Sequence, residues 1–452
     1  MSEELRMTGD GEPVLDRRRF FGGATLAGLA AVGAELGVGS PARRVAASEG
    51  HRPRPDPPAG AADGPYLDVR TFGARGDGKT DDTPALRKAV AQVAAQGGKL
   101  IFPAGRFLVT APVEADFGGR GVWLAGAGQG ATLLVTRQPD ASIFALAGNI
   151  LTLSDLTLMG SPAARSGALL TTHCATENLC RCLFLTYHNG IRALGNVAMI
   201  RDCSWQGPQS GGSNGLIVDG YAGGMTVDGA VMYVPGIDPH SGIRIKPQSG
   251  IQVLHCGALQ IADSNIMLQN HDLLIVPPKG RGAFSINAIN TFFDTATTGI
   301  NISPRGGVVA RCSFTQCWAS SHSENGIYIG GTGLIDGIQL VAPQVNFCGE
   351  NGISINAPAK NIMIEGGEGV HNKKAAIHIG DKVTGVMVNH FFGGAGFGGS
   401  GPGYGNDFGI VIGRNCDAYQ IANCQLLGNR SGAIRDGSSA TAAKRIVANN
   451  MV

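Results

Sequence analysis

Alternating apolar positions recur along the chain behind a glycine, at nearly constant intervals. The pairs that begin these runs are Gly190-Ile191, Gly215-Leu216, Gly242-Ile243, Gly299-Ile300, Gly326-Ile327, Gly352-Ile353 and Gly409-Ile410. The glycines are 25, 27, 57, 27, 26 and 57 positions apart, and Ala376-Ile377 divides the last interval. A fixed period in the twenties predicts supersecondary units that stack on one another.

Each unit also carries a second short strand, in which a small or apolar residue, a spacer and a large apolar residue follow one another. The examples are Leu156-Thr157-Leu158, Cys182-Leu183-Phe184, Cys203-Ser204-Trp205, Cys312-Ser313-Phe314, Val345-Asn346-Phe347 and Cys424-Gln425-Leu426. Period-two alternation places the two flanking residues on one face. We therefore expect the cysteines and Trp205 to lie in a buried ladder, where a free thiol behaves as a small hydrophobe.

The pattern predicts an all-β fold in which short parallel strands form a β-helix of stacked coils. The leucine-rich repeat has a similar period, but its Leu and Asn signature is missing. The exception is an amphipathic helix predicted from Ala85 to Ala94, with Thr80 to Pro84 as its N-terminal boundary and Gly97-Gly98 as its end. This helix is expected to cover the first coil, which would otherwise expose strand edges.

The segment from Val69 to Thr83, Val-Arg-Thr-Phe-Gly-Ala-Arg-Gly-Asp-Gly-Lys-Thr-Asp-Asp-Thr, continues to Gly97-Gly98-Lys-Leu-Ile-Phe-Pro-Ala-Gly105. It resembles the N-terminal segment of the pectate-lyase-like superfamily, which includes rhamnogalacturonase- and epimerase-type proteins and phage tailspike depolymerases. The resemblance implies a right-handed single-stranded parallel β-helix that acts on acidic or complex polysaccharides outside the cell. It leaves the reaction open, because hydrolases, lyases, epimerases and non-enzymatic binders share that fold. Asp77, Asp81 and Asp82 lie in this segment, where capping and turn roles are expected.

The N-terminus is expected to be an export signal. Arg17-Arg18-Arg19-Phe20-Phe21 resembles a twin-arginine motif, and Val45-Ala46-Ala47 is a suitable cleavage site. We predict a signal peptide over 1–47, a Pro- and Gly-rich linker over 48–65, and one β-helix domain over 66–452 with its capping segment at 66–105. The implied partner is the twin-arginine (Tat) translocation machinery and the implied location is periplasmic or secreted. No segment is apolar enough for a stable membrane span.

Composition narrows the function classes. The chain has 36 Lys and Arg against 34 Asp and Glu in 452 residues, so its formal net charge is +2. This near-neutral charge does not indicate a nucleic-acid-binding protein. Glycine supplies 70 residues, roughly twice the ordinary share, as a fold with many tight turns requires. The cysteines form no pair of CxxC motifs, so a zinc site is not expected.

Aligning the Gly-Ile runs predicts an outward column of Arg192, Ile217, Arg244, Asn301, Tyr328, Ser354, His378 and Val411. In the next column, Asp219 is expected beside Lys246. Arg244, Lys246, Asp219 and Asp238 are therefore the candidate catalytic residues, and Tyr328, Asn301 and His240 the candidate substrate-binding residues.

The candidate residues allow two reactions. In a lyase, Arg244 would clamp the sugar carboxylate and Lys246 or Tyr328 would remove the C5 proton. In a hydrolase, two carboxylates from Asp219, Asp228 and Asp238 would act together. The same three carboxylates are the only candidates for a Ca²⁺ site, and no coordination pattern is evident. A solvated ladder of ion pairs is the structural alternative.

The sequence thus predicts an exported protein that acts on a polysaccharide, expected to contain uronic acids, by β-elimination or glycosidic hydrolysis. A glycan-binding or surface-attachment protein without catalysis is the alternative.

Overall fold

The computed structural model describes residues 66–140, 142–208, 211–221, 223–233, 247–395 and 405–452. The predicted signal peptide and linker lie outside these residues. So do four of the candidate site residues, Asp238, His240, Arg244 and Lys246.

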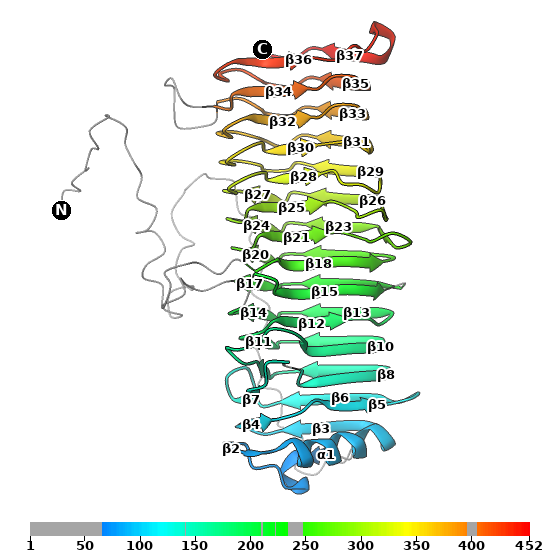
Figure 1. The fold of residues 1–452 in the computed structure, drawn as a ribbon, viewed down its shortest axis with the longest axis vertical. Helices are drawn as coiled ribbons and strands as arrows, with labels where there is room; N and C mark the ends of the chain where they lie inside the picture. The colour runs from blue at the N-terminus through cyan, green and yellow to red at the C-terminus, as the bar shows by residue number, and fades with distance from the viewer. Residues whose placement is uncertain (1–65, 141, 209–210, 222, 234–246, 396–404) are drawn as a thin grey trace, which may run out of the picture. The chain divides into compact units, whose positions relative to one another are not determined.

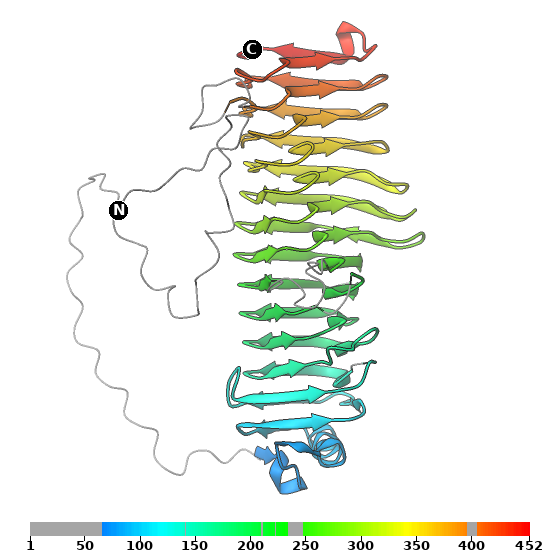
Figure 2. The same ribbon diagram turned by 60° about the vertical axis from the view of Figure 1, so that its left-hand side comes forward.

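The predicted parallel β-helix is confirmed. The strands form one sheet of 27 strands and a second sheet of 10, and neighbouring coils pair in parallel. The coils stack in chain order from the N-terminal to the C-terminal end of the described domain (Figures 1 and 2). Because strands pair only with the coils before and after them, residues one repeat apart become neighbours.

The coils up to Ser320 contribute strands to three stacks, and beyond Ser320 the third side continues as isolated bridges at Gln344, Glu368, Phe392, Gln425 and Met451. The first stack, which follows the Gly-Ile runs, contains β5 (Val113–Asp116), the first halves of β8 (Phe144–Ser154) and β10 (Ala168–Cys180), β12 (Asn189–Ala193), β15 (Asn214–Tyr221), β18 (Ser249–Cys256), β21 (His271–Ile275), β25 (Thr298–Ile302), β28 (Ile327–Ile329), β30 (Ile353–Ile355), β32 (Ala375–Ile379), β34 (Phe408–Ile412) and β36 (Gly432–Asp436).

The second stack contains β1 (Tyr66–Asp68), β3 (Gly98–Phe102), β6 (Gly121–Gly126), the second halves of β8 and β10, β13 (Val197–Arg201), β16 (Gly224–Asp228), β19 (Leu259–Ala262), β23 (Ile286–Ile289), β26 (Val308–Thr315), β29 (Leu334–Val341), β31 (Ala359–Glu365), β33 (Thr384–Asn389), β35 (Asp417–Ala422) and β37 (Arg445–Ala448). The short strand β22 (Gly282–Phe284) pairs with the end of β18 on one side and with the start of β26 on the other. The 3-10 helix η3 (Ala442–Lys444) precedes β37.

The third stack is the second sheet, with β2 (Asp77–Asp81), β4 (Gly105–Val109), β7 (Thr132–Thr136), β9 (Thr157–Met159), β11 (Leu183–Leu185), β14 (Ser204–Gln206), β17 (Val231–Tyr233), β20 (Asn265–Met267), β24 (Phe292–Asp294) and β27 (Trp318–Ser320).

One residue per coil turns the chain from the second stack to the third by adopting the left-handed conformation. Its φ lies between 46° and 63° at Asp155, Arg181, Asp202, Gly229, Asp263, Asn290, Gln316, Ala342, Gly366, His390, Asn423 and Asn449. Asp, Asn and Gly tolerate this conformation best, which explains their frequency at this corner.

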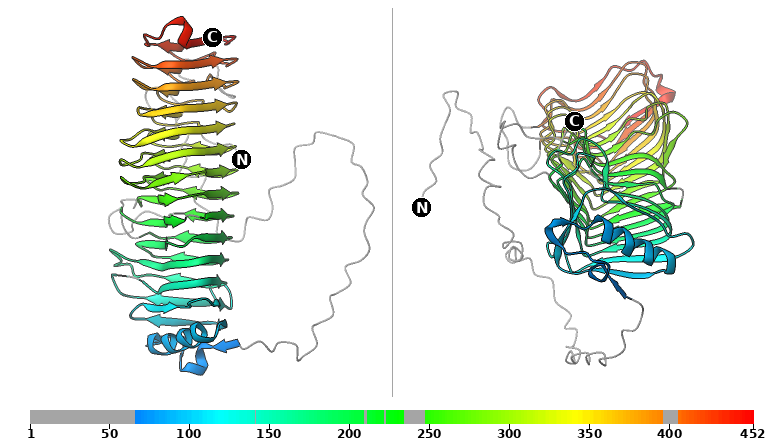
Figure 3. Two further views of the ribbon diagram at one scale, coloured as in Figure 1. Left: turned by 90° about the vertical axis from the view of Figure 1, so that its right-hand side faces the viewer. Right: turned by 60° about the horizontal axis from the view of Figure 1, so that its bottom comes forward.

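The predicted helix is α1 (Thr83–Gln96), and Gly97 ends it. It lies across the N-terminal end of the stack (Figure 3) and buries Leu86, Val90 and Val93 there. The capping hydrogen bond expected at the start of this helix is not made by its N-cap residue, Asp82. Its carboxylate instead accepts from the backbone N–H groups of Arg75 and Gly76, at 2.6 and 3.2 Å.

The neighbouring Asp81 accepts from the Thr83 backbone N–H at 3.0 Å, and so takes the place of the missing cap. Asp77 accepts from the backbone N–H groups of Lys79 and Thr80. The hydrogen bonds from Thr80 and Lys79 lower the pKa of Asp77 to about 2. The expected turn and capping roles of these aspartates are therefore confirmed for Asp77 and Asp81.

The apolar residues of the Gly-Ile runs point inward as predicted. Leu216, Val218, Ile300, Ile302, Ile327 and Ile329 have no exposed surface, and Ile353, Ile355, Ile377 and Ile379 continue the same core. Trp205 is also fully buried, stacked on Phe184 with ring centroids 5.2 Å apart. Phe347 contradicts the predicted pattern, because it has a left-handed φ of 58° and is 43% exposed.

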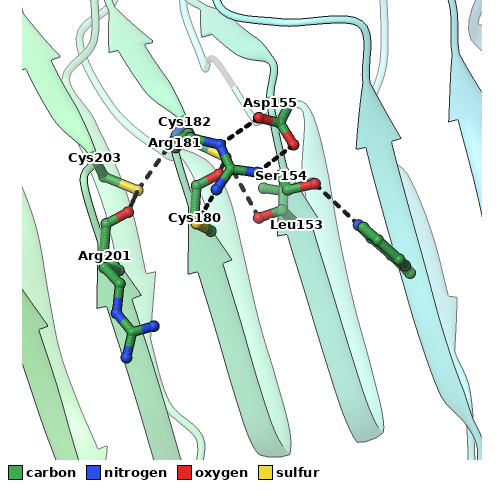
Figure 4. A network of polar contacts seen from close by, with 9 residues as sticks. Leu153, Ser154, Asp155, Cys180, Arg181, Cys182, Arg201 and Cys203 are labelled. Carbon is green, nitrogen blue, oxygen red and sulfur yellow. Dashed lines mark hydrogen bonds and ion pairs between the residues drawn. The ribbon is translucent and has the colours of Figure 1, made fainter. Parts of the chain in front are cut away.

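The cysteines are buried, as expected. Nine of the ten are buried free thiols and Cys180 is half-buried. At the corner drawn in Figure 4, the Cys182 thiol donates to the Leu153 carbonyl oxygen at 3.5 Å and the Cys203 thiol to that of Arg201 at 3.4 Å. Cys312 was predicted for this ladder, but it lies in β26 of the second stack.

The predicted register is wrong at one place. Gly250-Ile251, rather than Gly242-Ile243, continues the stack, because Leu216 pairs with Ile251. Between Gly215 and Gly299 the described chain makes two coils, through β18 and β21, and Asp272 takes the glycine position in β21. Two Gly-Ile pairs lie eight residues apart here, and spacing alone selected the wrong one.

Candidate functional site

The outward side of the first stack, here called the Gly-Ile face, carries one continuous column of side chains. In register order the column reads Thr171, Arg192, Ile217, Gln252, Leu274, Asn301, Tyr328, Ser354, His378, Val411 and Arg435. The predicted neighbours Asn301, Tyr328, Ser354 and His378 are confirmed in this order. Gln252 takes the position expected for Arg244.

Two arginines converge on one carboxylate at the N-terminal part of this face. Asp219, near the end of β15, forms ion pairs with Arg192 of β12, at 3.4 Å, and with Arg281, which follows β21. The Asp219 side chain is only 10% exposed, whereas those of Arg192 and Arg281 are 51% and 48% exposed. We call these three residues the arginine cluster. Among the described residues, the cluster presents two reachable guanidinium groups against one covered carboxylate, an excess of one positive charge.

A local irregularity in the sheet positions Asp219. The register between β15 and β18 shifts on both sides of this residue, which pairs with His255 instead of the predicted Lys246. Gly220 follows with a φ of 147°, and a Cβ there would lie 2.9 Å from the Leu194 carbonyl oxygen. Such irregularities re-aim side chains and are frequent near functional sites.

His255 is held by the backbone of the next coil. Its Nδ1 lies 2.8 Å from the Gly282 carbonyl oxygen and 3.4 Å from the Gly282 nitrogen. A carbonyl oxygen only accepts, so the shorter contact assigns the proton to Nδ1. In the neutral ring the lone pair is then on Nε2, the arrangement of a histidine that can accept a proton or bind a ligand.

A row of polar side chains runs beside the column, where the first-stack strands begin. The Asn214 amide donates to Asn189 at 3.0 Å, and the Ser249 hydroxyl donates to Asn214 at 2.7 Å. His271 continues the row and contacts Asn301 at 3.4 Å. Burial lowers the pKa of His271 to about 4, so this imidazole is neutral at ordinary pH.

The predicted site residues do not form one cluster. Tyr328 lies on β28, four strands beyond the β15 strand of Asp219, and four inter-strand spacings span ~19 Å. Asn301 on β25 is three spacings away, ~14 Å. Asp219, Asn301 and Tyr328 therefore share a face but cannot contact a single sugar residue together.

Asp228, a candidate for the hydrolase pair, lies on another side of the coil. It belongs to β16 in the second stack, and its carboxylate is 3.9 Å from Arg201 on the neighbouring strand. Of the three candidate carboxylates, Asp219 and Asp228 therefore do not lie together on one face, and Asp238 lies outside the described residues. Among the residues that the structure describes, no group of three His, Cys, Asp or Glu side chains is placed to hold a metal ion.

Sequence reasoning missed three residues of this region. Arg192 was placed in the outward column without a role, and neither His255 nor Arg281 was singled out. Arg281 lies in a loop outside the Gly-Ile pattern, and the register shift at Asp219 conceals its pairing with His255. Even an alignment on Gly250-Ile251 would place Leu254 opposite Asp219, because the register shift after Val218 adds one residue before His255.

Comparison with known families supports the predicted resemblance at the N-terminal end. Residues 66–176 match the family described as rhamnogalacturonase A/epimerase, pectate lyase-like. Alginate lyase 7 of Azotobacter vinelandii is 42% identical over 71 residues, which are 15% of this chain and 8% of that protein. Mannuronan C5-epimerase AlgE4 of the same organism is 44% identical over 71 residues, 15% of this chain and 13% of the relative. The matched segments thus span a small part of these relatives.

Solved structures extend the likeness of fold over most of the chain. The A-module of the Azotobacter vinelandii mannuronan C-5 epimerase AlgE4 has a TM-score of 0.55 at 15% identity, covering 83% of this chain and 99% of that module. The Dettilon tailspike protein has a TM-score of 0.54 at 15% identity, covering 72% and 66%. At 15% sequence identity, these similarities show a shared fold and no more. Within the described residues, no helix has the length and apolar character required to cross a membrane.

Proposed function

We propose that this protein acts outside the cytoplasm on a uronic-acid-containing polysaccharide, which binds along the Gly-Ile face and loses the C5 proton of a uronate residue there. One observation carries the proposal: Arg192 and Arg281 converge on Asp219 and keep one positive charge available at an exposed face. The guanidinium group suits a sugar carboxylate, because it offers two parallel donors.

Binding of the carboxylate is also the chemical requirement for the reaction. Neutralising the charge of a uronate acidifies the adjacent C5–H bond, so that a moderate base can remove the proton. The base proposed here is His255, whose Nε2 carries the lone pair and whose backbone pairs with Asp219. Asp219 acts as a positioning residue, since its carboxylate holds both guanidinium groups in place.

The residues from 234 to 246 connect β17 to the strand that follows, and they contain the other candidates. Arg244 is proposed as a second carboxylate clamp and His240 as a substrate-binding residue. Lys246 and Asp238 are proposed as the acid that protonates the leaving oxygen. These assignments rest on their chemistry, on their place in the sequence between Tyr233 and Pro247, and on no contact.

Elimination is favoured over hydrolysis. Hydrolysis requires two carboxylates across one glycosidic bond, ~5–9.5 Å apart. Asp219 is engaged by two arginines and Asp228 belongs to another stack, so this pair is unsuitable. Epimerisation is the second candidate, because it begins with the same proton removal and a mannuronan C5-epimerase is among the relatives of the N-terminal segment.

The test is incubation of the purified protein with alginates, pectins and bacterial exopolysaccharides. Elimination produces unsaturated ends that absorb in the ultraviolet, and epimerisation changes the C5 configuration without new ends. Reducing ends without ultraviolet absorbance would contradict the proposal in favour of hydrolysis. Retention on a polyuronate without any chemical change would leave the non-catalytic binder as the function.

The proposed location follows from the substrate and from the twin-arginine motif at Arg17-Arg18. Fusing residues 1–47 to a reporter that folds in the cytoplasm tests it. Export that depends on the Tat machinery, and that fails when Arg17 and Arg18 are both changed to Lys, is the expected result. Export of the variant would contradict it.

A further inference from the structure

A hollow of about 410 Å³ opens on the Gly-Ile face toward its C-terminal end. Its lining includes Tyr328, Ser354 and His378 of the central column, with Glu350, Lys374 and Arg435 around them. We call it the C-terminal hollow. It shares no residue with the arginine cluster.

The hollow contains two cations that a ligand can reach. Lys374 is 2.6 Å from Glu350, and their side chains are 59% and 39% exposed, so water screens this ion pair. Arg435 lies over the Phe408 ring at 4.8 Å, and within the described residues no carboxylate forms an ion pair with it. Its guanidinium edge is therefore open to an anion while its flat face stacks on the ring.

The positive charges of the hollow affect the pKa of the neighbouring His378. The pKa of His378 is lowered, first by burial and then by the positive charges of Arg435 and Lys374. The imidazole is therefore neutral near pH 7 and acts as a hydrogen-bonding group. The lining also contains the carboxylates of Glu350 and Asp407, so the attraction for an anion comes from the local contact with Arg435 and Lys374 and not from a net charge of the hollow.

The remaining polar groups suit sugar hydroxyls. Asn356 donates to the Ser354 hydroxyl at 3.1 Å, which lies 3.5 Å from Nδ1 of His378. The Tyr328 ring leans over Gly330, where a Cβ would lie 2.8 Å from the phenol oxygen. An aromatic ring beside hydroxyl, amide and imidazole groups offers both stacking and hydrogen bonds to adjacent sugar rings of a chain.

We propose that the C-terminal hollow is a second polyuronate-binding site, in which Arg435 and Lys374 hold the carboxylate of one sugar while Tyr328, Ser354 and His378 contact the rings of its neighbours in the chain. From β15 to β32 the stack has six inter-strand spacings, so this site lies ~29 Å from the arginine cluster along one face. Only a chain of several sugars reaches both sites. Because the second contact is then intramolecular, long chains bind more tightly than short ones.

The experiment measures binding directly, apart from any reaction. Fluorescence anisotropy of end-labelled polymannuronate is recorded for the whole protein and for Arg435→Ala and Lys374→Ala. The matched control is Arg311→Ala, which also removes an arginine that lies over a phenylalanine, Phe284 at 5.9 Å, outside the hollow. Each hollow variant is expected to weaken binding of the long chain about tenfold, the loss of one charge-assisted contact, and the control to leave it unchanged.

A labelled trimannuronate and neutral dextran complete the test. The trimer, which is too short to bridge the two sites, is expected to bind more weakly than the long chain, and dextran is expected not to bind. Long-chain affinity that is equal in the wild type and both hollow variants would overturn the second site, even if the protein turns over polyuronates. Affinity that depends on Arg435 without any turnover would support the second site and refute the proposed reaction alone.

Discussion

Asp219 and Arg281 are 62 positions apart in the sequence and form an ion pair on the Gly-Ile face. Arg192, which is 27 positions before Asp219, contacts the other carboxylate oxygen. The coil spacing brings the three together, because one repeat along the chain equals one strand spacing in the stack. This cluster supplies the positive charge on which the proposed reaction depends.

Replacing Arg281 by Ala is expected to lower kcat/KM on a polyuronate by about 10- to 100-fold, the loss of one hydrogen-bonded charge. The matched control is Arg201→Ala, which breaks a comparable ion pair with Asp228 on the second stack. Initial rates of both variants on one polymer provide the measurement. A control that loses as much activity as Arg281→Ala would show that the effect comes from general charge or folding.

Replacing His255 by Gln is expected to reduce kcat by about 10²- to 10⁴-fold, because the amide cannot accept the C5 proton. Binding of the polymer is expected to remain within a few-fold of the wild type, as the arginine cluster is intact. His390→Gln is the control, since His390 pairs with Glu365 at a corner away from this face. Turnover of His255→Gln at the wild-type rate would assign the base elsewhere.

The partly buried His271 is expected to make the stability of the fold depend on pH. Its pKa is about 4 in the fold, against ~6.5 for an unperturbed histidine, so between these values the unfolded chain binds a proton that the folded chain excludes. Stability contributed by this residue is thus complete above pH 6.5 and declines as the pH falls toward 4, by up to about 3 kcal/mol.

Urea unfolding at pH 7 and pH 4.5 of the wild type and of His271→Asn measures this contribution. The wild type is expected to lose more stability than the variant over this interval, because the amide does not titrate. Equal losses would show that His271 is hydrated or protonated in the folded protein.

The thiols of the native protein are expected to react slowly. Burial raises the pKa of Cys256 to about 11 and the pKa values of Cys174, Cys312, Cys317 and Cys348 to about 12, so little thiolate forms at pH 8. Titration with an aromatic disulfide reagent is expected to modify at most the half-buried Cys180 in the native state and all ten cysteines in denaturant. Several fast-reacting thiols in the native state would contradict the buried ladder.

The fold could be predicted because its determinants are local and repeated. An apolar residue at every second position, such as Ile327 and Ile329, indicates which side of a strand is buried, and the same pattern recurs in each coil. The helix from Thr83 to Gln96 was equally predictable, since Pro84 and Gly97 mark its two ends.

The site was less predictable because its geometry depends on register. Gly242-Ile243 and Gly250-Ile251 satisfy the same pattern, and the wrong pair places Lys246 beside Asp219. The right pair would place Leu254 there, because the register shift that brings His255 opposite Asp219 leaves no trace in the spacing. Arg281 lies in a loop with no periodicity, and only the folded chain shows that it reaches Asp219. The corner residue Phe347 shows the same limit, because period-two alternation does not hold where φ becomes positive.

Proton NMR of a polyuronate incubated with the protein in heavy water tests the central claim most directly, since it observes C5 itself. The account predicts that the wild type removes C5 protons, giving either unsaturated residues or deuterium at C5, and that the double variant Arg192→Ala, Arg281→Ala does so at least tenfold more slowly. Chain cleavage with every C5 proton retained, or equal rates in the two proteins, would contradict it.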